Sequence, residues 1–189
     1  PIHMGHLVCA EQARDALDLD GVIFMPAGNP VFKKHIEVSD AHHRVAMCRA
    51  AIEDNPAFDV STLEVDRAGD TYTVDTLETL RAHYPENVEL YFIAGADAIL
   101  TLPQWRDAPR LARLASFVGL NRPRSASLQS LQIAKKLAGT GFRTLFVEAP
   151  LFELSSSDIR KRILGNRSVR YLIPPAVLEY IESVGLYGD

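Results

Sequence analysis

Short apolar segments alternate with helix-like segments along almost the whole chain of 189 residues, and this alternation constrains the fold more than any other feature. We expect strands at residues 21–25, 58–63, 88–94, 117–120 and 144–147. Apolar residues recur at helical spacing between them, and the connecting loops are short. Strands that alternate with helices pair in parallel. The sequence therefore predicts an α/β fold with a doubly wound parallel sheet, followed by a small C-terminal helical portion.

Polar residues mark the starts of the expected helices. Ser39 is expected to cap a helix that runs to about Asp54. Either Thr71 or Thr73 is expected to cap another, which runs to about Tyr84.

The composition narrows the class of function. The net charge is −4, and no block of lysine and arginine stands out, which argues against binding to nucleic acid or to an anionic membrane surface. No apolar run is long enough to cross a membrane. Cys9 and Cys48 lie in apolar helical patterns without metal-ligand spacing, so we expect buried thiols in a reducing, cytoplasmic compartment.

Two histidines near the start of the chain are the first candidates for chemistry. His3 and His6 lie three positions apart, with Gly5 between them, where a helix is expected to begin. A helix N-terminus offers unpaired N–H groups and a partial positive charge, so this arrangement suits a phosphate. For these few residues alone, a chance pair on a surface helix is an equally good interpretation.

A serine-rich segment far along the chain is the second candidate. Ser156 and Ser157 stand at an expected helix start, and Arg160 lies one turn further on. Hydroxyls, free N–H groups and a guanidinium on one side can together hold phosphate oxygens. An ordinary serine N-cap beside surface cations explains the segment slightly better when it is considered alone.

The remaining candidates are weaker one by one. The strand expected at residues 88–94 leads straight into Gly95 and Asp97, which places them at the carboxyl edge of the sheet, where open α/β sheets bind ligands. A plain helix cap by Asp97 is an equally good interpretation. Trp105 could stack on a flat ring but is more often a core residue. The polar segment Thr71, Tyr72 and Thr73 could contact a substrate but could also be a helix cap. The loop cations Lys33 and Arg122 could bind a second phosphate but could simply be solvated.

Taken together, the motifs resemble one family. They are His3-Met4-Gly5-His6, Gly69–Leu77, Phe92–Ala98, Leu102-Pro103-Gln104-Trp105, Arg122-Pro123, Ser155–Arg160 and the ending from Tyr171 to Tyr187. In this order they look like bacterial nicotinate-nucleotide adenylyltransferases, nucleotidyltransferases with an HxGH motif. The resemblance implies one Rossmann-like domain over residues 1–189. It also implies that ATP and nicotinate mononucleotide are joined into nicotinate adenine dinucleotide in NAD biosynthesis, with release of pyrophosphate.

The resemblance also implies roles for the candidate residues. His3 and His6 would stabilise charge on the α-phosphate, close to Gly5, and Ser156, Ser157 and Arg160 would hold the β- and γ-phosphates. Gly95 and Asp97 would contact the adenosine. Trp105 would stack on the pyridine ring in a pocket that Thr71, Tyr72 and Thr73 line, and Lys33 and Arg122 would approach the mononucleotide phosphate. Mg²⁺ would be held mainly by the ATP phosphates rather than by a protein cage.

The sequence departs from the family pattern at two places. The Gly-Gly-x-Phe-Asp segment and the first strand of the family are expected before Pro1 and are missing from this chain. In addition, Phe32 stands where the family has a histidine, next to Lys33. The alternatives are therefore another HxGH nucleotidyltransferase, of the pantetheine-phosphate, glycerol-phosphate or nicotinamide-mononucleotide type, and a nucleotide-binding remnant without activity. Nicotinate or nicotinamide preference and a homo-oligomeric state stay open.

Overall fold

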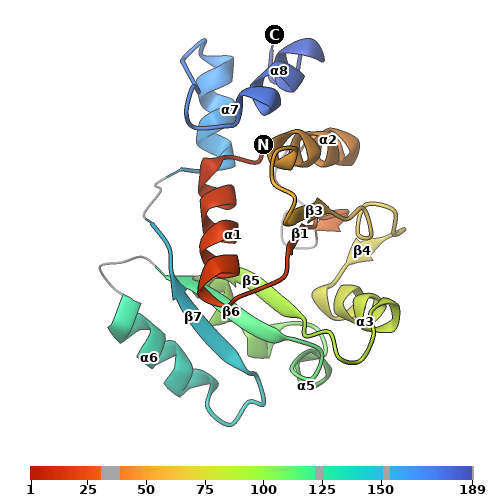
Figure 1. Ribbon diagram of the computed structural model, residues 1–189, viewed down its shortest axis with the longest axis vertical. Coiled ribbons are helices and arrows are strands. Elements are labelled where there is room, and N and C mark those ends of the chain that lie inside the picture. The colour runs from red at the N-terminus through yellow and green to blue at the C-terminus, as the bar shows by residue number, and fades with distance from the viewer. Residues whose placement is uncertain (31–38, 122–125, 151–153, 189) are drawn as a thin grey trace.

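The computed structural model describes residues 1–30, 39–121, 126–150 and 154–188. The elements are α1 (Met4–Ala16), β1 (Val22–Phe24), β2 (Asn29–Pro30), α2 (Ala41–Ile52), β3 (Phe58–Val60), β4 (Asp70–Thr71), α3 (Thr73–His83), β5 (Tyr91–Gly95), α4 (Ala96–Ile99), the 3-10 helix η2 (Leu102–Gln104), α5 (Ala108–Leu111), β6 (Ser116–Asn121), α6 (Ala126–Leu137), β7 (Thr144–Glu148), α7 (Ser156–Leu164) and α8 (Pro175–Ser183). Strands and helices alternate as predicted (Figure 1).

All strand pairs are parallel, which confirms the predicted α/β class. The strands form three hydrogen-bonded groups, β1–β3, β2–β4 and β5–β6–β7. Strand β1 pairs with β3, and β5 pairs with β6. Within the described residues, no hydrogen-bonded pairing joins β1 to β5. The three-stranded group β5–β6–β7 contributes residues to the first hydrophobic core, which also includes side chains of α3, α4, α5 and α6.

Helices pack on both faces of β6. Neighbouring residues of a strand point to opposite faces, and both Phe117 and Val118 are fully buried. Phe117 belongs to a core cluster with Ile99 of α4 and Ile133 of α6, while α1 contacts β6 and β7. The doubly wound arrangement that the sequence predicts is thus present around this strand.

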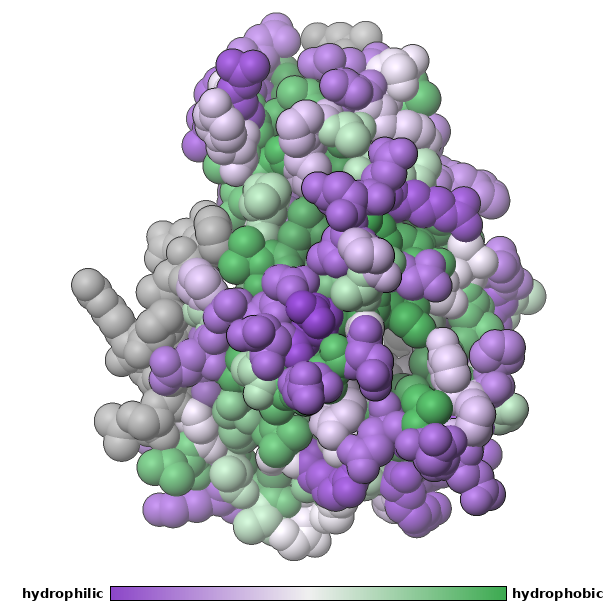
Figure 2. Space-filling view, in the orientation of Figure 1, coloured by the Kyte–Doolittle hydropathy of each residue, from purple (hydrophilic) through white to green (hydrophobic). Residues whose placement is uncertain are grey.

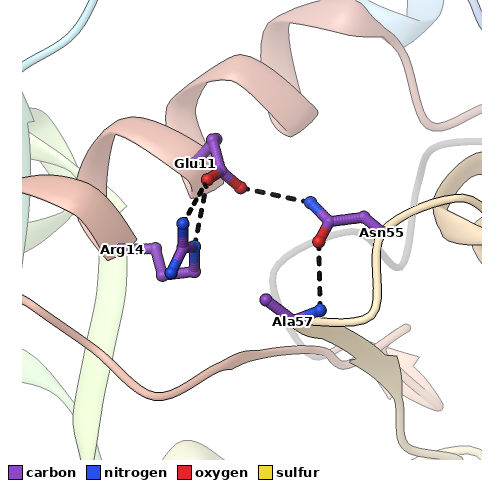
Figure 3. Close-up of polar contacts among 4 residues, drawn as sticks. All are labelled: Glu11, Arg14, Asn55 and Ala57. Carbon is purple, nitrogen blue, oxygen red and sulfur yellow. Dashed lines mark hydrogen bonds and ion pairs between the residues drawn. The ribbon is translucent and has the colours of Figure 1, made fainter.

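Helix α1 is also tied to the segment that leads into β3 (Figure 3). Glu11 accepts two hydrogen bonds from Arg14, at 3.0 and 2.7 Å, and a third from the Asn55 amide at 3.1 Å. The side-chain amide oxygen of Asn55 in turn accepts a hydrogen bond from the Ala57 backbone N–H at 3.0 Å. These bonds connect the helix that begins with the histidine pair to the β1–β3 ladder.

A second core lies between α2, α7 and α8, and the last two of these helices form the predicted C-terminal helical portion. Met47, Ile159, Val177 and Ile181 are almost fully buried there. In Figure 2 this part forms the narrower upper end of the molecule, with apolar residues visible at its base among hydrophilic ones. No helix within the described ranges is long and apolar enough to cross a membrane.

Two predicted helix caps are wrong. Asp40, rather than Ser39, caps α2, because its carboxylate accepts the His42 N–H at 2.8 Å, while the Ser39 hydroxyl bonds the Tyr187 hydroxyl. Helix α3 begins after Tyr72, an extended residue that makes no side-chain cap bond among the described atoms.

Two predicted strands are shorter than expected. Strand β3 ends at Val60 instead of residue 63. Strand β5 begins at Tyr91 because Val88 forms a turn, in which its N–H donates to the Pro85 carbonyl and its own carbonyl accepts from Arg81.

Candidate active site

The predicted histidine pair is held in one arrangement at the start of α1. The rings of His3 and His6 are stacked, with 3.8 Å between their centroids and 29° between their planes. His3 is the N-cap residue, and its backbone N–H donates to Nδ1 of His6 at 3.3 Å. Nδ1 of His6 is therefore engaged by the His3 backbone, and this bond helps to fix the His6 ring at the helix start.

The two rings lie in different surroundings. The His6 side chain is exposed, whereas His3 is only 6% exposed. Burial, and secondly the neighbouring His6, lower the pKa of His3 to about 4. Nδ1 of His3 has no hydrogen-bond partner within the part of the chain that the structure describes. His3 is thus a neutral imidazole at physiological pH, with an unused polar atom at the helix start.

The serine segment meets the start of the chain. Ser156 lies 155 positions from Pro1, and its hydroxyl donates to the Pro1 carbonyl oxygen at 2.8 Å. The Met4 N–H donates to the Leu172 carbonyl oxygen at 2.9 Å, in the loop that follows α7. The start of α7 and the start of α1 are therefore neighbours, and the two segments that the sequence singled out come together.

The first turn of α7 presents several donors. Ser155 is its N-cap, and its hydroxyl oxygen accepts the Asp158 N–H at 3.1 Å. Arg160 donates to the Ser157 hydroxyl oxygen at 3.1 Å, which leaves the hydroxyl proton of Ser157 able to donate elsewhere. Together with the guanidinium, this proton can bind an anion at the helix start.

The end of β5 forms a separate part of the candidate site. Gly95 is the last residue of β5 and the N-cap of α4, so Asp97 lies in the first turn of this helix rather than at its cap. Both residues are exposed. A Cβ atom added to Gly95 would meet no protein atom within 4 Å, so open space lies in front of this backbone. A ligand can approach the strand end closely there.

The residues predicted to line the ring pocket lie directly before α3, at its start and directly after η2. The Trp105 side chain is held in place because its Nε1 donates to Thr101 Oγ1 at 2.9 Å and its ring packs edge-on against Phe92. Tyr72 packs on the same core cluster, directly before α3. Thr71 Oγ1 donates to the Asn29 carbonyl oxygen at 3.3 Å, and Thr73 opens the helix.

Some candidates fall outside these groups. Lys33 and Arg122 lie outside the described residues. The sequence analysis missed Arg106, whose guanidinium lies over the Tyr72 ring, 4.2 Å from its centroid. Its place directly after Trp105 was the signal that could have found it. Within the described ranges, no three His, Cys, Asp or Glu side chains form a group that could hold a metal ion.

Comparison with known proteins places this geometry in a family. The family model described as cytidylyltransferase-like matches residues 1–162. A "probable nicotinate-nucleotide adenylyltransferase" of Corynebacterium jeikeium is 44% identical, over 99% of this chain and 95% of that protein. A protein of the same name from Moorella thermoacetica is 46% identical, over 99% and 87%. The chain belongs to the nicotinate-nucleotide adenylyltransferase family.

Solved structures give the same fold for the family. The Plasmodium falciparum nicotinic acid mononucleotide adenylyltransferase in complex with NaAD superposes with a TM-score of 0.76, at 20% identity, over 99% of this chain and 92% of that one. At this identity the likeness concerns the fold, and it confirms the Rossmann-like nucleotidyltransferase architecture. The resemblance read from the sequence motifs, and the assignment as a nucleotidyltransferase, are thereby confirmed.

Proposed function

We propose that this chain transfers the adenylyl group of ATP to nicotinate mononucleotide and forms nicotinate adenine dinucleotide and pyrophosphate. The stacked pair His3–His6, with the start of α7 docked beside it, is the observation that carries the proposal. Family membership supplies the reaction, since the relatives are named for it.

The reaction is a direct displacement at phosphorus. An oxygen of the mononucleotide phosphate attacks the α-phosphorus of ATP, so that a new P–O bond forms while the bond to the β-phosphate bridging oxygen breaks. Pyrophosphate leaves with that electron pair. No covalent bond to the protein is required, so positioning and charge stabilisation are the contributions of the chain.

The histidines divide this work unequally. The exposed His6 can turn its ring toward an α-phosphate oxygen, and Gly5 beside it keeps the helix start small enough for a phosphate to approach. His3 is buried against it and stays neutral, so it acts as an uncharged hydrogen-bonding group rather than as a cation.

The leaving pyrophosphate is assigned to the start of α7. Ser157 and Arg160 already form a pair there and can turn donors toward the β- and γ-phosphates. The Ser156 hydroxyl proton is engaged by the Pro1 carbonyl, so we assign Ser156 mainly a role in holding α7 beside the histidines, with its backbone N–H available to phosphate.

The two ends of the dinucleotide product are assigned to the other parts of the site. Adenosine would lie against the open backbone at Gly95, next to Asp97. The pyridine ring would stack on Trp105, whose orientation is already fixed, beside Tyr72 and its flanking threonines. ATP would enter as its magnesium complex, with the metal carried by the phosphates. Because Cys9 and Cys48 are free thiols, we propose a cytoplasmic location.

The test is pyrophosphate release from MgATP with nicotinate mononucleotide, with the dinucleotide product identified by mass. The purified chain should release one pyrophosphate per dinucleotide formed. His6→Ala should lose most of this activity, because a group directed at the charged transition state accounts for roughly 10²–10³ in rate. The matched control is His42→Ala, a substitution of an exposed histidine on α2.

Three outcomes would count against the proposal. Transfer to pantetheine phosphate or glycerol phosphate in place of nicotinate mononucleotide would assign the chain to another nucleotidyltransferase. ATP binding without release in any mixture would favour a binding remnant. Full activity of His6→Ala would remove the histidine pair from the mechanism.

A further inference from the structure

A single arginine lies on the proposed pyridine pocket and has no role in the reaction described above. The Arg106 guanidinium covers the ring of Tyr72 at 4.2 Å from the centroid. Tyr72 belongs to the segment before α3, and Arg106 follows Trp105, so this contact joins the two segments assigned to the pyridine ring. A guanidinium on an aromatic face keeps its charge and its N–H donors at the ring edge.

The charge of Arg106 is not neutralised by the acidic residues around it. Arg110 pairs with Glu78 through Nε and lies 3.9 Å from the Asp107 carboxylate through Nη1. The Glu78 carboxylate on α3 and the Asp107 carboxylate next to Arg106 in sequence are thus engaged by the same neighbouring arginine. Among the residues that the structure describes, no carboxylate forms an ion pair with Arg106 itself.

We propose that the Arg106 side chain is a specificity-determining residue that favours a mononucleotide with a carboxylate on its pyridine ring over one with an amide. This inference rests on the proposed function and names the group that selects its substrate.

The physical basis is charge rather than shape. A carboxylate and a primary amide on the same ring are nearly equal in size and outline, so a pocket cannot separate them by steric fit. They differ by one negative charge, and Arg106 is the one cation within the segments 71–73 and 105–106. An unpaired guanidinium can donate two parallel hydrogen bonds to a carboxylate, but it meets the NH₂ group of an amide donor to donor.

The size of the effect follows from the exposure of the arginine. Arg106 is exposed, so water screens its charge and the discrimination it contributes is moderate. For a partly exposed, charge-assisted contact we expect roughly three- to tenfold in the ratio of the two substrates.

The experiment compares nicotinate and nicotinamide mononucleotides as substrates of three proteins, namely the wild-type chain, Arg106→Gln and Arg106→Lys. The readouts are kcat/KM for each substrate and the binding affinity of each mononucleotide by calorimetry. Arg106→Gln should lose roughly three- to tenfold in the nicotinate-to-nicotinamide ratio. Arg106→Lys should retain most of the ratio, because it keeps the charge although it loses the planar guanidinium.

The matched control is Arg110→Gln, which removes a charge from the same surface but one that is already paired with Glu78. It should leave the ratio unchanged. Equal losses with both mononucleotides in Arg106→Gln would show that the arginine only supports Tyr72, and an unchanged ratio would show that it does nothing selective. Either result overturns the inference while leaving the proposed function intact.

Failure of the proposed function would look different. A wild-type chain that turns over neither mononucleotide contradicts the reaction, and the calorimetric ratio then still tests Arg106. Equal affinity of wild type for both mononucleotides, or binding of neither, would overturn the inference as well.

Discussion

A fall in pH from 6.5 toward 4 should destabilise this protein, because the buried His3 resists protonation in the folded state. His3 is 6% exposed, and its pKa is lowered from 6.5 to about 4 by burial and by the stacked His6. As the pH falls below 6.5, the unfolded chain binds a proton at this position while the folded chain does not. The contribution of the neutral His3 ring to the free energy of unfolding is therefore fully present above pH 6.5, and it is lost progressively as the pH falls toward 4.

The magnitude follows from the two pKa values. The interval between 6.5 and about 4 corresponds to about 3 kcal/mol of unfolding free energy, since each pH unit is worth about 1.4 kcal/mol. Because the ring is buried, solvent screening does not reduce this figure much. The loss would be a large part of the 5–15 kcal/mol that is typical of a folded domain.

The assay is urea unfolding of wild type and His3→Phe at several pH values between 7 and 4. Phenylalanine keeps a buried ring but cannot be protonated. The wild-type free energy of unfolding should fall by about 3 kcal/mol more than that of His3→Phe over this range, because the carboxylates titrate in both proteins and cancel in the difference.

Titration of the imidazole C–H resonances by NMR gives the independent check. Two results would refute the reasoning: a His3 resonance that titrates near 6.5 in the folded protein, or parallel pH profiles for wild type and His3→Phe. Either would mean that the ring is hydrated in solution.

Three further substitutions test other parts of the structure. Gly95→Ala should leave the melting temperature unchanged, because no protein atom lies within 4 Å of the added Cβ, yet weaken ATP binding by roughly tenfold if adenosine lies there; unchanged ATP affinity would contradict the placement. Gly28→Ala should lower the free energy of unfolding by about 3 kcal/mol, because its Cβ would lie 1.9 Å from the Glu64 carbonyl oxygen, and a normal urea midpoint would show that this contact relaxes. Ser156→Ala should cost about 1 kcal/mol by losing the bond to Pro1, visible as a melting temperature lower by about 2–4 °C, and no change would show that the bond contributes nothing.

Most of the fold could be predicted from hydrophobic periodicity. The order of strands and helices follows from it, and the helix start at Ser156 and Ser157 was identified correctly. The caps of α2 and α3 were not, because a cap depends on which side chain reaches the free N–H groups. At α2 the Ser39 hydroxyl is used by Tyr187, 148 residues away, which leaves Asp40 to accept the bond. No local pattern reports such a contact.

The candidate site, too, could be predicted from the sequence only in part. The residue types and spacings of His3–His6 and Ser156–Arg160 indicate phosphate chemistry, because imidazole, hydroxyl and guanidinium groups at helix starts suit anions. Sequence alone also determined the family, since several motifs in one order are far more specific than any single one.

The tertiary structure decided how these groups differ and which of them meet. Burial makes His3 neutral while His6 stays exposed, and the bond from Ser156 to Pro1 brings together two segments that are 155 positions apart. The Arg106 guanidinium lies over Tyr72, while the neighbouring Arg110 pairs with Glu78 and approaches Asp107. Charge state and pairing depend on what surrounds a side chain in space, and the order of residues along the chain does not contain that information.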